Sequence, residues 1–232
     1  MTKDFDDEVG ADLDEALKAD HVQRTPCVLV LDTSGSMASD GRIEKLNFGL
    51  RRFEQTIKGT EQLRKQVLLL VIGFGESVEL LADWTQAEDF TAPKLVSSGM
   101  TPMGQAMRYA HSCVEDISLR LRSEGITFTR PWIFLMSDGG PNDEGWEEAA
   151  MDSRRACEER RATVWPLAVP PGADGEKLHR FARTDMKVFT VDDDFAGIFE
   201  WLVTTLGQVV QSTPGQGIQI TEPGPVYFSV DV

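Results

Sequence analysis

The chain has 232 residues, of which 41% are hydrophobic, and a formal net charge of −15. This length and apolar content suit one globular domain with a substantial core, and they exclude a wholly disordered chain. A chain with this much negative charge repels phosphate backbones and anionic lipids. We therefore expect neither nucleic acid nor a membrane as a partner.

Residues 1–22 are expected to form an acidic, flexible N-terminal segment. The first twenty residues hold eight acidic side chains and two lysines, which is the opposite of the charge of a secretory leader. The longest strongly apolar run, Val67 to Ile72, is too short to cross a bilayer. We therefore expect a cytoplasmic protein.

Residues 23–210 alternate strand and helix patterns, which is typical of an α/β domain with a mostly parallel sheet and helices on both faces. Strands are predicted at 27–31, 66–73, 77–82, 131–137, 163–169 and 187–191, and helices at 43–59, 103–121, 144–161, 176–182 and 195–209. The third strand follows the second across Gly73-Phe74-Gly75. These two are expected to pair as a hairpin, which gives the sheet one antiparallel edge strand.

Residues 211–232 change to a Gly- and Pro-containing composition that ends in a short apolar stretch. This pattern predicts a C-terminal tail that is either a docked strand or a loose arm.

The three cysteines, Cys27, Cys113 and Cys157, are far apart and have no paired spacing. We therefore expect free thiols. The three histidines show no ligand spacing either, so we expect no zinc site.

Polar side chains gather in three segments at the predicted strand and helix ends. Asp32-Thr33-Ser34-Gly35-Ser36 follows the first strand, and Ser137-Asp138-Gly139-Gly140 ends the fourth. The loop Ser98–Pro102 leads into the long second helix. Because ligands of such sheets bind outside the carboxyl ends of the strands, we expect these segments to converge. Their oxygen donors include two carboxylates, Asp32 and Asp138, and the hydroxyls of Ser34, Ser36 and Thr101. Such donors favour a hard cation, best Mg²⁺, then Mn²⁺, with Ca²⁺ less suited.

The same three segments resemble the von Willebrand factor A family. Asp32-Thr33-Ser34-Gly35-Ser36 matches that family's D-x-S-x-S signature, Met100–Gly104 resembles its threonine loop, and Ser137-Asp138-Gly139 its third loop. The resemblance implies the Rossmann-like fold of the family and its metal-ion-dependent adhesion site. It also implies a ligand set: Asp32, Ser34, Ser36, Thr101 and Asp138, the last directly or through water.

Residues 83–104 most resemble the bacterial, intracellular branch of the family associated with tellurium resistance. That resemblance implies a stress or signalling system with a Ser/Thr protein kinase and a PP2C-type protein phosphatase as partners. The ligand set does not fill an octahedron, so we expect an Asp or Glu carboxylate of a protein partner to complete it. The expected function is therefore a non-enzymatic, metal-dependent interaction module.

Other interpretations of these residues are open. The first segment can be merely a strand-to-helix turn, and Thr101 can cap the helix that follows it. Asn142 and Asp143 are expected to cap the helix that begins near residue 144. Met100, Met103 and Met107 are expected to be packing residues.

Two rival functions remain. In a haloacid-dehalogenase-type phosphatase, Asp32 would be the nucleophile, although Ser34 stands where those enzymes need a second Asp. A purely structural adaptor would use its metal only to hold the loops together.

Overall fold

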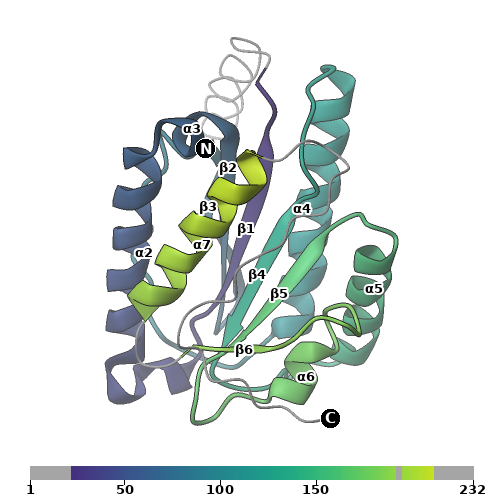
Figure 1. Ribbon diagram of the computed structural model, residues 1–232. Helices are drawn as coiled ribbons and strands as arrows, with labels where there is room; N and C mark the ends of the chain where they lie inside the picture. The colour runs from purple at the N-terminus through teal and green to yellow at the C-terminus, as the bar shows by residue number, and fades with distance from the viewer. Residues whose placement is uncertain (1–21, 192–194, 212–232) are drawn as a thin grey trace, which may run out of the picture.

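A computed structural model describes residues 22–191 and 195–211 of the chain (Figure 1). The predicted acidic segment and C-terminal tail lie, but for one residue each, outside the described residues. The sheet has six strands in the order β3-β2-β1-β4-β5-β6. Their bounds are β1 Thr25–Asp32, β2 Val67–Phe74, β3 Val78–Gln86, β4 Trp132–Ser137, β5 Thr163–Ala168 and β6 Phe189–Thr190. Strand β3 runs antiparallel to β2, and the other neighbouring pairs are parallel. The predicted α/β fold and its antiparallel edge strand are confirmed.

Helices cover both faces of the sheet, as predicted (Figure 1). They are α2 Arg42–Gly59, α3 Glu61–Gln66, α4 Met103–Ser123, α5 Trp146–Glu158, α6 Gly175–His179 and α7 Phe195–Val210. Helices α2, α3 and α7 contribute to one core cluster, and α4, α5 and α6 to the other. None of the described helices has the length and apolarity that crossing a bilayer requires.

The sequence pattern missed two short elements, the 3-10 helix η1 (Gly35–Gly41) and helix α3. Each buries a single side chain, Met37 in η1 and Leu63 in α3. One buried residue gives no repeat at helical spacing, so hydrophobic periodicity cannot find such elements.

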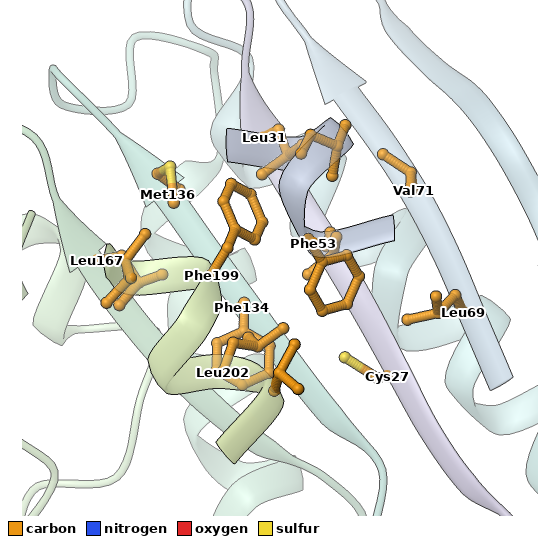
Figure 2. Close-up of a cluster of buried hydrophobic side chains, with 14 of the residues drawn as sticks. Cys27, Leu31, Phe53, Leu69, Val71, Phe134, Met136, Leu167, Phe199 and Leu202 are labelled. Atoms are coloured by element: carbon orange, nitrogen blue, oxygen red, sulfur yellow. The ribbon is translucent and has the colours of Figure 1, made fainter. Parts of the chain in front are cut away.

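Successive residues of the central strands point to opposite faces, so β1 contributes to both cores. On one face, Phe53 of α2 and Phe199 of α7 meet above the sheet with their ring centroids 5.5 Å apart (Figure 2). Close approach of the two helices depends on Gly49 of α2, because a Cβ atom there would lie 2.8 Å from the Phe199 ring. This packing holds α2, and the loop before it, against the edge of the sheet that bears the polar loops.

The strand order places the ends of β1 and β4 side by side. From β1 the chain continues to β2 on one side, while β4 pairs with β1 on the other, with Leu31 opposite Met136. Asp32 and Ser137 therefore end two adjacent parallel strands at the point where the connections diverge. In open α/β sheets this position is where ligands bind.

Candidate metal centre

Asp32 is fully buried at the end of β1, and its carboxylate organises the first loop. Its Oδ1 atom accepts a hydrogen bond of 2.8 Å from the backbone N–H of Ser34. Ser34 is also the N-cap of η1, but its side chain makes no capping hydrogen bond. Its hydroxyl instead lies 2.9 Å from the Ser36 hydroxyl. The loop is a turn, as one interpretation expected, but its hydroxyls do not serve as helix caps.

Asp138, which follows β4, is buried and joined to the first loop by side chains. The Ser36 hydroxyl donates a 2.6 Å hydrogen bond to Asp138 Oδ1. The hydroxyl of Ser137 donates to the second oxygen of Asp32, Oδ2. Two carboxylates and three hydroxyls from separate strand ends thus form one connected cluster of oxygen atoms.

The loop that carries Thr101 contacts both other loops through its backbone. The N–H of Gly35 donates to the carbonyl of Gly99 at 3.1 Å, and Thr101 and Asn142 exchange two hydrogen bonds. Thr101 is buried, yet in the described part of the chain its hydroxyl makes no hydrogen bond to a protein group. The structure therefore brings Thr101 to the loops but not into the hydrogen-bonded cluster of Asp32, Ser34, Ser36 and Asp138.

The residues that cap the N-termini of helices α4 and α5 differ from those expected from the sequence. Helix α4 begins after an N-cap at Pro102 without a side-chain cap, so Thr101 does not cap it. Asp143 caps α4 instead, because its two carboxylate oxygens accept from the N–H groups of Gly104 and Gln105 at 3.0 and 2.9 Å. The prediction that Asn142 and Asp143 cap the next helix was wrong, since α5 begins later, after Gly145. The third loop thereby fixes the start of the helix that follows Thr101.

One of the three expected packing methionines is not buried. Met103 and Met107 are fully buried in the α4 core, whereas Met100 is 63% exposed. Met100 directly precedes Thr101, so an apolar side chain faces solvent beside the cluster.

Burial governs the charge state of Asp32. It raises the pKa of this carboxyl from 3.8 to about 6, opposed by the hydrogen bonds from Ser137 and Ser34 and assisted slightly by the charge of Asp138. An ionised carboxylate is unfavourable in such a place unless a cation compensates it. The two buried acids therefore form a site that attracts positive charge.

The chain supplies one such charge itself. The guanidinium of Arg42 donates to Asp138 Oδ2 at 2.7 Å, and both side chains are buried. Arg42 was not among the residues expected from the sequence. A signal was available, because Arg42 is the first residue of α2 and a cation is unfavourable at a helix N-terminus. A basic side chain there needs another reason for its position.

The chemistry of the cluster fits a hard divalent cation. Among the described residues no group of three or more His, Cys, Asp or Glu side chains could hold a metal ion, so any site here must use hydroxyl oxygens. The Ser34–Ser36 and Ser36–Asp138 oxygen distances are 2.9 and 2.6 Å. Neighbouring ligands around Mg²⁺ are about 3 Å apart, because each lies roughly 2.1 Å from the ion. Asp32, Ser34, Ser36, Thr101 and Asp138 remain the predicted ligand set.

Comparison with known proteins decides the family. The family model of the von Willebrand factor type A domain matches residues 27–140, which include all three loops. The chain carries a von Willebrand factor type A domain. No curated protein matches the chain.

Solved von Willebrand factor type A structures share this fold. The domain of the type V pili tip protein Mfa5 from Porphyromonas gingivalis is 13% identical, with a TM-score of 0.65, over 84% of this chain and 99% of that one. A type A protein from Catenulispora acidiphila is 15% identical, with a TM-score of 0.61, over 79% of this chain and 42% of that one. Proximal thread matrix protein 1 from the mussel byssus, with a zinc-occupied MIDAS motif, is 16% identical, with a TM-score of 0.51, over 79% and 46% of the two chains.

These likenesses establish the fold. This chain spans less than half the length of the first three structures it matches. The motif named for the mussel protein is the metal-ion-dependent adhesion site, so a von Willebrand factor type A domain can carry a divalent metal there.

Proposed function

We propose that this domain binds protein partners through a divalent metal held by its three loops. Asp32, Ser34, Ser36 and Thr101 would hold the ion, Asp138 would hold it directly or through water, and a partner's Asp or Glu would complete the coordination. We propose Mg²⁺ as the ion, with Mn²⁺ as its closest substitute, because every donor is oxygen. The domain would act as an adaptor and not as an enzyme.

One observation carries the proposal: the hydrogen-bonded cluster that joins Asp32, Ser34, Ser36 and Asp138. A mere strand-to-helix turn would need the first loop only. Here the Ser36 hydroxyl, which no helix cap requires, donates to the carboxylate of Asp138 in the loop after another strand, β4. Hydroxyl ligands are neutral, so they would leave positive charge on the metal for an incoming anion.

The surface around the cluster supports a selective interaction. Asp40 and Glu144 are exposed near the loops and would repel an acidic partner. The exposed Met100 offers an apolar contact beside Thr101. The best partner would therefore present one carboxylate for the metal, surrounded by basic and apolar side chains.

The test uses Mn²⁺ and acetate as the simplest carboxylate. Bound Mn²⁺ is paramagnetic, so it will shorten the relaxation time of acetate methyl protons when the carboxylate binds next to it. Wild-type protein with Mn²⁺ is expected to give this effect beyond that of Mn²⁺ alone, and Asp32→Ala is expected to remove the excess. Equal acetate relaxation with both proteins would refute the proposal.

The phosphatase alternative is not favoured. The family match includes both Asp32 and Asp138, and the residue two positions after Asp32 is Ser34, whose hydroxyl cannot act as the general acid. Hydrolysis of a generic phosphate ester, abolished by Asp32→Asn, would bring this alternative back.

The resemblance to the tellurium-resistance branch supports a narrower proposal. In it, the domain serves a bacterial, cytoplasmic stress or signalling system that includes a Ser/Thr kinase and a PP2C-type phosphatase. Purified candidates of these two classes should bind the wild-type domain with Mg²⁺ and lose binding with chelator. Binding that persists in chelator and in Asp32→Ala would remove the metal from the interaction.

A further inference from the structure

Arg42 is a buried cation placed inside the candidate metal centre. Its side chain is only 8% exposed, and its Nη1 atom lies 2.7 Å from Oδ2 of a fully buried Asp138 carboxylate. The other oxygen of that carboxylate accepts from Ser36. Arg42 therefore occupies the side of Asp138 that the serine cluster leaves open.

The backbone before Arg42 is shaped to place it there. Asp40 has φ 54° and Gly41 has φ 66°, so two consecutive left-handed residues turn the chain from η1 into α2. Left-handed backbone is unfavourable for most residues other than glycine, although Asn and Asp tolerate it better than the rest. The turn makes Arg42 the first residue of α2, where its charge opposes the helix dipole. A cation at this position does not stabilise the helix. The turn therefore serves to place Arg42 where it can form the ion pair with Asp138.

We propose that Arg42 is a built-in counter-ion that keeps the metal affinity of the empty site low and couples metal binding to carboxylate binding. The inference rests on the proposed function and specifies its regulation. The positive charge of an arginine side chain compensates the negative charge of one of the two buried carboxylates. Asp40 also lies near Arg42, 3.4 Å away, but its side chain is 76% exposed and solvent screens its charge.

The charge balance predicts the coupling. A site that holds one divalent ion between two carboxylates has no net charge. Because Arg42 adds one positive charge, the metal-loaded site of this chain has a net charge of +1. Such a site retains the metal weakly until an anionic ligand arrives. By linkage, a carboxylate that binds better in the presence of the metal also makes the metal bind better, by the same factor.

The experiment measures the Mn²⁺ dissociation constant of the full chain, with and without acetate. Arg42→Gln removes the charge and keeps an N–H donor for Asp138, and Arg42→Lys keeps the charge. Arg52→Gln is the matched control, since Arg52 is exposed on the same helix and pairs with Glu200. Circular dichroism confirms that each variant is folded before the titration.

We expect Arg42→Gln to bind Mn²⁺ at least about tenfold more tightly than wild type, because removing one positive charge close to a divalent ion gives roughly this gain even at the dielectric constant of water, and a larger gain at that of a protein. Arg42→Lys and Arg52→Gln should stay within about twofold of wild type, because the buried charge is kept in both. Acetate should raise the Mn²⁺ affinity of wild type more than that of Arg42→Gln.

Two results would overturn the inference about Arg42 and leave the proposed function intact. In one, Arg42→Gln binds Mn²⁺ as wild type does or more weakly, so that Arg42 only positions Asp138. In the other, Arg52→Gln gains as much affinity, so that only overall charge matters. If Asp32→Ala binds Mn²⁺ as wild type does, or if no variant binds it, the proposed function itself fails.

Discussion

Ser36 and Asp138 are 102 positions apart in sequence, yet the Ser36 hydroxyl donates a 2.6 Å hydrogen bond to the Asp138 carboxylate. The pairing of β1 with β4 makes this contact, because it sets the first and third loops side by side at the carboxyl edge of the sheet. A serine that is exposed as a residue thus reaches a buried carboxylate. The contact links the fold to the metal chemistry that we propose.

Asp32→Asn should stabilise the metal-free protein and abolish metal binding. Burial raises the pKa of Asp32 from 3.8 to about 6, so the folded chain favours the neutral carboxyl. The stability that this group contributes is therefore present below about pH 4 and is lost as the pH rises through about 6. We expect the free energy of unfolding at pH 7.5, measured with urea and chelator, to rise by about 1–2 kcal/mol.

Asp116→Asn is the control for this experiment, since Asp116 is exposed on α4 and the substitution removes the same charge. It should change stability by less than about 0.5 kcal/mol. If Asp32→Asn destabilises the protein instead, the carboxylate is a structural turn residue and the cluster was not built for a cation.

Asp143→Ala should weaken both stability and metal binding. Asp143 supplies the N-terminal cap of α4 through Gly104 and Gln105, so its loss should cost about 1 kcal/mol. The Thr101 loop leads into that helix, and a loosened start should weaken Mn²⁺ binding. Urea unfolding and Mn²⁺ titration check the two effects, with the exposed neighbour Glu144→Ala as the control that changes neither.

Gly49→Ala should destabilise the protein although alanine is the better helix former. The added Cβ would lie 2.8 Å from the Phe199 ring and 3.1 Å from the backbone of Phe195, so α7 must move away from α2. We expect a loss of about 1–3 kcal/mol in thermal or urea unfolding. Gly207→Ala in α7, where a Cβ meets no atom within 4 Å, should gain about 0.5–1 kcal/mol. Equal effects of the two substitutions would contradict the packing described for α2 and α7.

His111 should make the protein less stable in mild acid. Burial lowers the pKa of its imidazole from 6.5 to about 4, with a smaller contribution from the charge of Arg161. The unfolded chain therefore takes up a proton before the folded one does. The stability from the neutral ring is present above about pH 6.5 and is lost as the pH falls through about 4.

His111→Gln should remove about 1–3 kcal/mol of the change in unfolding free energy between pH 7 and pH 4. The ring lies 2.9 Å from the Ser153 hydroxyl, which donates to the carbonyl of Phe181, and glutamine can still donate to that hydroxyl. His179→Gln in α6 is the matched control. An unchanged pH profile in His111→Gln would show that the pKa of this imidazole is the same in the folded and the unfolded chain.

Hydrophobic pattern alone predicted most of the sheet. Strand β4, Trp132–Ser137, is buried along its whole length, and a short, nearly continuous apolar run is typical of a strand covered on both faces. The hairpin of β2 and β3 was likewise readable from the two glycines, Gly73 and Gly75, at the end of β2. The loops were predictable as a set because the family signature places them at strand ends.

Contacts between distant loops were not predictable in the same way. Asp143 stands in a sequence that favours capping the next helix, but tertiary packing brings it to the start of α4 instead. The pairing of Arg42 with Asp138 depends on a left-handed turn at Asp40 and on strand adjacency, and neither leaves a periodic trace in the sequence.

We propose that Asp32 and its neighbours hold one divalent cation. Titration of Mn²⁺ followed by electron paramagnetic resonance tests it most directly, because free and bound Mn²⁺ give distinct signals. We predict one bound ion per wild-type chain, none in Asp32→Ala, and binding weakened by about tenfold or more in Thr101→Ala. Equal Mn²⁺ binding by wild type and Asp32→Ala would contradict the claim.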